Sequence, residues 1–237
     1  MGASLREQLL RVVAATREKE ADELLPHCDD LPPAQPGRWT VKDHLAHMAA
    51  WRQHAAVVLE AARRGEAHTS EPPLDERNAA IYEATRSAPA AAVAQSVGDS
   101  WAALRRAIEA SSEEDLSAPL PAHPERQAWE VIPGNTHQHL GEHLEYLAVE
   151  RGDEPGALAA ARWVHDLALE AFTDARNRAS AAYNLACFYA RRGRESEALP
   201  LLRDAFSLNP ALVKWARDDP DLQPIRDRPA VIEALRA

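Results

Sequence analysis

The sequence predicts an all-α protein, in which an up-down four-helix bundle is followed by a small helical domain. Three observations carry this prediction. Ala, Leu, Glu and Arg dominate the 237 residues while β-branched residues are few, a composition that favours helices. Apolar residues recur at helical spacing through several long segments, and Pro-rich segments separate them. The hydrophobic fraction of 46% is enough for a sizeable core.

The first predicted helix spans residues 4–25, because its apolar side chains return to one face of a helix. Those side chains are Leu5, Leu9, Val12, Val13 and Leu24. A loop is expected over residues 26–38, where Pro32, Pro33, Pro36 and Gly37 interrupt any helix.

The second predicted helix begins after Thr40, whose side chain is placed to cap it. Asp43, three residues later, completes a short version of a capping box. The helix is expected to continue to Arg64, since Gly65 then offers the residue type that most often ends helices.

Three further helices complete the predicted bundle. A short helix is expected over residues 75–86, and a long one follows Ser87 and Pro89 and runs to about residue 111. Turn-forming prolines fill residues 112–134. The last bundle helix is expected from residue 135 to 151. Long amphipathic helices joined by Pro-rich loops predict a four-helix bundle.

The chain changes character after the linker candidate Gly152–Gly156. The sequence then resembles the tetratricopeptide pattern, an antiparallel pair of helices of about 34 residues. The matching positions are the small residues Ala186 and Ala198, the turn residue Gly193 and the closing Pro210. The predicted domains are therefore a bundle at residues 1–151 and a tetratricopeptide-like helical domain at residues 157–237. A single repeat does not bury its own face, so we expect it to pack on the bundle or on another chain.

Composition narrows the possible partners and compartments. The formal net charge of −10 argues against a nucleic-acid partner. No run of about 18 apolar residues is present, so no membrane crossing is expected. The first residues lack the features of a secretory signal. Cys28 and Cys187 fall in different predicted domains, which makes a disulfide framework improbable and suggests a cytoplasmic protein.

His139 and His143 form the most suggestive chemical pattern in the chain. Their i, i+4 spacing places both imidazoles on one face of a helix, where they could share a metal ion. A third histidine from another helix would leave a coordination position open. The same spacing also fits two ordinary histidines at the edge of an apolar stripe. His137 is expected to be solvated, and His54 to lie at the surface or behind the ligands.

Residues 1–150 resemble the DinB-like four-helix bundle superfamily, and most closely its ClbS/DfsB branch. The shared motifs are Trp39-Thr40-Val41-Lys42-Asp43, Leu45-Ala46-His47-Met48, Trp51, Asn78 to Tyr82, and Asn135-Thr136 with His139 and His143. Many members of the superfamily hold a divalent metal with one histidine of the second helix and two of the fourth. The resemblance therefore implies His47, His139 and His143 as metal ligands. By direction on the helix alone, His44 is the alternative to His47.

The resemblance implies two classes of function. The first is a metal-dependent enzyme that uses Zn, Ni or Fe to act on a small, toxic molecule, either as a hydrolase or as a thiol-dependent transferase. No catalytic side chain is assigned beyond the metal ligands. The second is a helical interaction or sequestration protein. In that case residues 157–237 would contact a protein partner or a second copy of the chain, for example in a homodimer.

Overall fold

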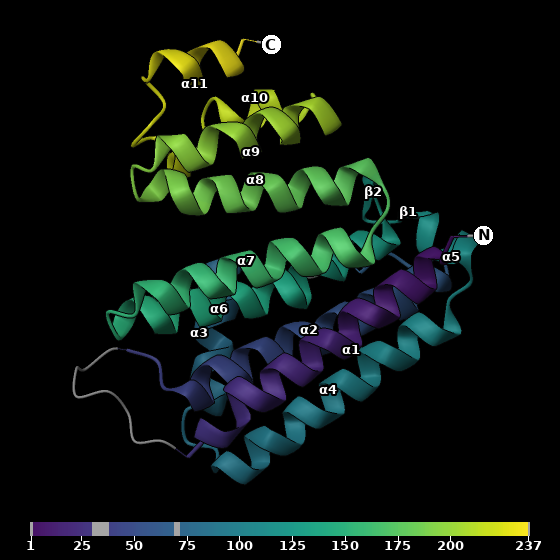
Figure 1. Cartoon of the computed structure of the whole chain (residues 1–237). Coiled ribbons are helices and arrows are strands. Elements are labelled where there is room, and N and C mark those ends of the chain that lie inside the picture. Colours follow the sequence, from purple (N-terminus) through teal and green to yellow (C-terminus); the bar gives the residue numbers. More distant parts are fainter. Residues whose placement is uncertain (1, 30–37, 69–71, 237) are drawn as a thin grey trace. The chain divides into compact units, whose positions relative to one another are not determined.

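A computed structural model describes residues 2–29, 38–68 and 72–236 (Figure 1). The chain divides into two compact units, one up to Leu140 and one from Gly141 onward. The division falls inside helix α6 (His137–Glu150). Helices make up most of both units, so the all-α prediction is confirmed. Most of the loop predicted at residues 26–38, including Gly37, lies outside the described residues.

Three long helices form the body of the first unit and lie side by side (Figure 1). They are α1 (Leu5–Glu23), α2 (Val41–Arg63) and α4 (Ala90–Ala110). The Thr40 hydroxyl accepts a hydrogen bond from the Asp43 backbone N–H, and the Asp43 carboxylate accepts one from the Thr40 backbone N–H, so the predicted capping box is confirmed. Gly65, at a φ of 70°, follows the end of α2. A left-handed φ costs glycine little, which is why the helix ends there.

A fully buried ion pair joins these three helices. Arg52 of α2 donates to both carboxylate oxygens of Glu20 on α1, at 2.8 and 3.1 Å. Trp101 of α4 donates its indole N–H to the same carboxylate at 2.6 Å, and the Arg52 guanidinium lies 4.2 Å from the Trp101 ring. Ser100 accepts from Arg52 Nε. Each of the three Arg52 nitrogens therefore donates a hydrogen bond, and both Glu20 oxygens accept at least one, so the buried charges compensate each other.

Shorter elements complete the first unit. Helix α3 (Leu74–Thr85) packs on α2, close to its predicted position. The segment predicted as turns contains α5 (Glu113–Ser117), an antiparallel hairpin of β1 (Pro119–Leu120) and β2 (His123–Gln127), and two 3-10 helices, η2 (Ala128–Val131) and η3 (Pro133–Asn135). The hairpin was not expected, because only Leu120 of its strands is buried and no alternation marks it.

The second unit consists of the end of α6 and a series of further helices. These are α7 (Glu154–Ala171), α8 (Ala175–Arg191), α9 (Glu195–Leu208), α10 (Leu212–Ala216), the 3-10 helix η4 (Pro220–Leu222) and α11 (Pro229–Ala234). Ala186 of α8 and Ala198 of α9 are both fully buried in one core, which agrees with small residues at a close helix contact. Gly193, at a φ of 66°, lies in the turn between the two helices.

Helices α6 and α7 approach each other closely at Gly141. A Cβ added to Gly141 would overlap the Cγ2 methyl of Val164 on α7. Any larger side chain at Gly141 would therefore force Val164 to move. The chain turns from α6 into α7 through Gly152, at a φ of 70°.

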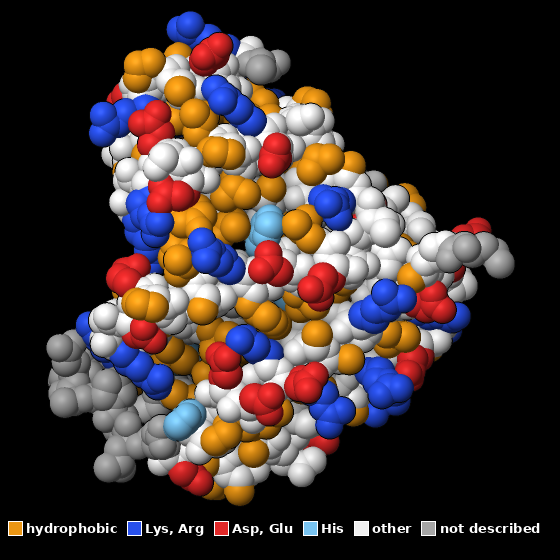
Figure 2. Space-filling model, viewed as in Figure 1, with side chains coloured by type: hydrophobic (Ala, Val, Ile, Leu, Met, Phe, Trp, Pro, Cys, Tyr) orange, Lys and Arg blue, Asp and Glu red, His pale blue; other side chains and the backbone are white. Residues whose placement is uncertain are grey.

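The surface carries mixed charge. Figure 2 shows acidic and basic side chains interspersed over the visible face, without a large area of one sign. None of the described helices combines the length and apolar character that a membrane crossing requires.

Candidate metal centre

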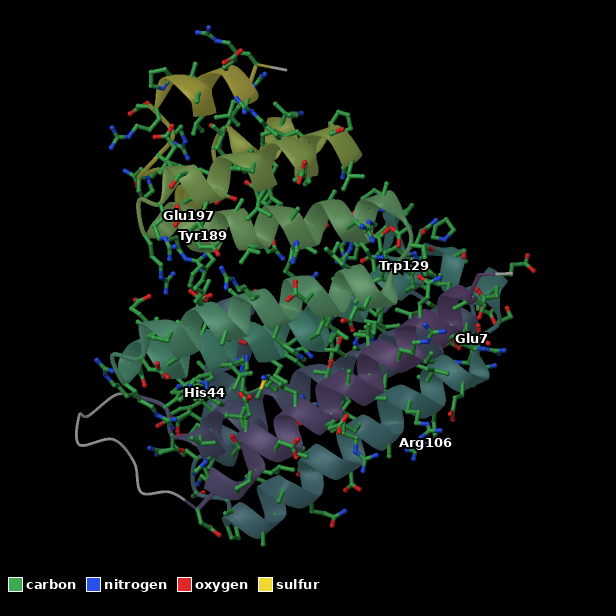
Figure 3. All side chains as sticks on the ribbon, viewed as in Figure 1. Glu7, His44, Arg106, Trp129, Tyr189 and Glu197 are labelled. Carbon is green, nitrogen blue, oxygen red and sulfur yellow. The ribbon has the colours of Figure 1, made fainter. Side chains whose placement is uncertain are left out.

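Helix α2 presents two buried histidines one turn after its capped start. His44 is 2% exposed and His47 is 6% exposed. Leu45 and Met48 are completely buried, so this turn of α2 is anchored in the core on the adjoining face. Figure 3 labels His44 within the first unit. The capping box fixes where the helix begins, and therefore which direction each imidazole takes.

Helix α6 supplies the other two histidines. Leu140 and Leu144 are buried, and His139 and His143 immediately precede them at half-buried positions. Just before the helix, the Thr136 hydroxyl donates to the carbonyl oxygen of Ile132 at 2.8 Å. This hydrogen bond, with the 3-10 helix η3, sets the direction in which α6 starts.

The three histidines come together. His47 Nε2 lies 3.1 Å from His139 Nε2. Possible ligand atoms of His47, His139 and His143 all lie within 4.8 Å of one another, and among the described residues no other group of three His, Cys, Asp or Glu side chains meets this condition. His44 is not part of the group, so the geometry favours His47 as the ligand from α2.

The spacing and the chemistry of these nitrogens fit a first-row divalent ion. Two imidazole nitrogens bound at 2.0–2.1 Å with a tetrahedral angle are about 3.3–3.4 Å apart, which is close to the separation of His47 from His139. An ordinary N–H···N hydrogen bond has a similar length, and a bound metal would replace the proton of that bond. The half-buried positions of His139 and His143 are consistent with an open coordination position.

Burial keeps the imidazoles neutral. It lowers the pKa of His47 to about 4. Burial, followed by the nearby His47, lowers the pKa of His139 to about 3. The neutral imidazole is the form that binds a metal ion, so these two side chains need not lose a proton at neutral pH before binding.

Aromatic side chains surround the α2 side of the cluster. The Trp39 ring lies 5.0 Å from the His47 ring and stacks in parallel on Tyr82 at 5.8 Å. The Trp51 ring lies 6.3 Å from His47. Trp51 in turn donates to Asn78 Oδ1 of α3. The sequence pattern alone did not indicate that these two tryptophans lie beside the histidines.

His137 corrects one sequence-based expectation. It was expected to be solvated, but it is only 1% exposed, and burial lowers its pKa to about 4. Its direction on an ideal helix is well away from the His139 pair, which suggested solvent. The 3-10 turn before α6 places this first helical residue inside the protein instead.

The fold and the site define a helical bundle with a partly buried three-histidine cluster shared by two of its helices. The sequence model of the DinB superfamily matches residues 16–147, more than half of the chain. The chain therefore belongs to the DinB superfamily, whose members often bind a metal. Comparison with curated proteins and with solved structures gave no match.

Proposed function

We propose that His47, His139 and His143 hold a divalent metal ion and that the protein is a metal-dependent enzyme acting on a small molecule. The observation that carries this proposal is the convergence of three imidazoles from α2 and α6 to within 4.8 Å. The lowered pKa values of His47 and His139 support it, because uncharged imidazoles suit Zn, Ni or Fe.

A bound ion of this kind would polarise a substrate group or bring the pKa of a bound water toward neutrality. The side chains of this protein would position it and control its surroundings. Helix α6 fixes two imidazoles one turn apart, and α2 brings the third. Trp39 and Trp51 restrict water around His47. Two reaction classes fit such a site: hydrolysis of a small molecule, and transfer to a low-molecular-weight thiol.

The motifs around Trp39, His47 and Asn78 favour the ClbS/DfsB branch within the superfamily. On that basis the physiological role would be protection of the cell against a reactive small molecule. The proposed location is the cytoplasm, and neither nucleic acid nor a membrane is a proposed partner, given the net charge of −10 and the mixed surface charge.

Metal analysis tests the proposal directly. Protein purified without an affinity tag should contain close to one equivalent of metal per chain. His139→Ala should lose most of it, whereas His27→Ala, which removes an exposed histidine of the same unit, should keep it. Equal, substoichiometric metal in all three proteins would mean that the cluster is not a metal site.

A second candidate function is supported by the surface of the second unit. The packed α8–α9 pair resembles one tetratricopeptide repeat, and Trp215 of α10 is 69% exposed. In this alternative, residues 157–237 bind a protein partner or a second copy of the chain. Light scattering of wild type and Trp215→Ser tests self-association. A wild-type dimer that the substitution dissociates would support the alternative, and a monomer in both would remove the homodimer from consideration.

A further inference from the structure

The first unit contains a cavity of about 220 Å³ beside the histidine cluster. Helix α2 forms one wall, and the segment containing the β1–β2 hairpin and the two 3-10 helices forms the other. The side chains that matter for the argument are Trp51, His54 and Val58 from α2, and Leu120, Val131 and Asn135 from the facing segment.

The cavity is lined by residues that adjoin, along the chain, the three histidines His47, His139 and His143, which we call the triad. On α2, His47, Trp51, His54 and Val58 follow one another at spacings of four, three and four residues, so they share one face of the helix. On the other side, Asn135 lies four residues before His139. The Trp51 ring is 6.3 Å from the His47 ring and 5.7 Å from the His54 ring, so one indole borders both the cluster and the cavity.

Helix α3 fixes this shared indole from outside. Asn78 Oδ1 accepts a hydrogen bond from Trp51 Nε1 at 3.1 Å. The Arg77 guanidinium lies 4.1 Å from the centre of the Trp51 ring. The Trp51 ring is therefore held in place by a hydrogen bond at its edge and by the Arg77 guanidinium over its face. Because it is ordered before any ligand binds, the entropic cost of binding is lower.

The described residues that line the cavity offer both apolar and hydrogen-bonding surface, and their charges balance. Trp51, Val58 and Leu120 supply apolar surface, while His54, His68 and His123 supply imidazole donors and acceptors. Among the described lining residues, Glu66 and Arg126 carry charges of opposite sign. Glu66 pairs with Arg64 at 2.8 Å, and Arg126 Nε lies 4.0 Å from the Glu130 carboxylate.

We propose that this cavity binds the substrate of the triad and selects a compact, uncharged molecule that carries an apolar group and an amide or ester carbonyl. A charged ligand would lose its hydration without meeting an uncommitted opposite charge. The volume is below the roughly 300–1,000 Å³ of cavities that hold drug-sized ligands, which limits the substrate to a small molecule. The inference rests on the proposed function, because it takes the triad to be the reactive centre.

Three probes of similar size test the charge preference. Benzamide is uncharged, benzoate is an anion and benzylamine is a cation at pH 7.5. Binding to the full-length protein is measured by ligand-observed NMR titration. Benzamide should bind, and benzoate and benzylamine should bind about tenfold more weakly or not at all, given the cost of desolvating a charge. Benzoate or benzylamine binding as tightly as benzamide would overturn the assignment to an uncharged substrate.

A matched pair of substitutions tests the location. Ala62→Phe places a phenyl ring in this cavity, whereas Ala102→Phe places one in a separate cavity between α1 and α4. Benzamide affinity should fall about tenfold in the first variant and stay unchanged in the second, because only the first reduces the space for the ligand. Val58→Phe fills the same cavity from the preceding turn and replaces Ala62→Phe if that variant does not fold. Unchanged benzamide binding in the folded cavity-filling variant would overturn the site.

Metal content, measured on the same samples, separates this inference from the proposed function. Wild type, Ala62→Phe and Ala102→Phe should carry equal metal, since none of these changes touches the three histidines. A protein that contains no metal but binds benzamide in the expected pattern would defeat the metal proposal and, with it, the assignment of the ligand as the substrate of the triad. Metal-loaded wild type that binds none of the probes would overturn the cavity assignment alone.

Discussion

Three buried histidines and the half-buried His139 give the first unit an unusual response to acid. Burial lowers the pKa of His44, His47 and His137 to about 4 and that of His139 to about 3. All four imidazoles are therefore uncharged in the folded protein at neutral pH. The unfolded chain returns each one to a pKa near 6.5.

The metal-free protein should consequently lose stability as the pH falls below about 6.5. Between about 6.5 and 4 the unfolded chain binds more protons than the folded one, so acidification lowers the free energy of unfolding. The decrease is up to about 1.4 kcal/mol per pH unit for each histidine. Urea unfolding at pH 7, 6 and 5 measures it. The variant His47→Gln/His139→Gln should show a shallower pH dependence, and equal midpoints at all three pH values would contradict the prediction.

Sequence reasoning at the level of residues predicted part of the site. The i, i+4 spacing indicated that His139 and His143 share a face, and possible ligand atoms of both lie within 4.8 Å of one another and of His47. Spacing did not separate His47 from His44, because both lie on the buried side of α2. The enclosing roles of Trp39 and Trp51 were not predictable, since an aromatic residue beside a site and one in a core have the same spacing.

At the scale of elements, the Glu20–Arg52 pair holds α1 to α2 and, through Trp101, to α4. Glu20→Gln should destabilise the protein by about 3–5 kcal/mol, because it leaves the buried Arg52 charge without its counter-charge. The measurement is chemical denaturation at pH 7. This loss of stability would come from leaving the Arg52 charge unpaired, and not from replacing the Glu20 side chain as such.

A double replacement provides the control. Glu20→Leu/Arg52→Met removes both charges and keeps an apolar core, so it should recover much of the stability lost in Glu20→Gln. If the double variant is as unstable as the single one, the pair contributes through something other than charge compensation. The helical pattern could not reveal this contact, because a charged residue on a helix is normally exposed and its partner here lies 32 residues away.

The contact between α8 and α9 depends on a small side chain. Ala198 is completely buried, so Ala198→Leu should overpack the contact and cost about 1–3 kcal/mol. Asp204→Leu on the exposed side of α9 is the matched control and should change stability by about 0.5 kcal/mol or less. Thermal unfolding of both variants gives the comparison. Similar midpoints for Ala198→Leu and wild type would argue against the tetratricopeptide register.

For the whole molecule, the important fact is that the division into two units falls within α6, between His139 and His143. The region that matches the DinB superfamily extends to residue 147, past this division. A fragment of residues 2–151 should therefore bind metal, whereas a fragment of residues 2–140 should not, because it lacks His143. Metal analysis of the two fragments, each checked for helicity by circular dichroism, tests this. Equal metal in both would exclude His143 as a required ligand.

The fold class could be predicted because it depends on helical periodicity within long segments and on the prolines between them. Both features can be read from residues that are close together in the sequence. The β1–β2 hairpin escaped prediction for the opposite reason. Its pairing joins Pro119 to Gln127, and all but one of its strand residues are exposed, so no apolar alternation marks the strands.

Gly141 lies between His139 and His143 on α6 and has no chemical group to offer, yet α7 leaves no room there for a Cβ. In a library of random variants screened for activity, this position should tolerate almost nothing, just as the neighbouring histidines should. A screen read without the structure would count it as part of the reactive centre. Gly141 contributes by letting α6 and α7 pack closely together. Replacing Val164 with a smaller residue should therefore restore function to the variant Gly141→Ala.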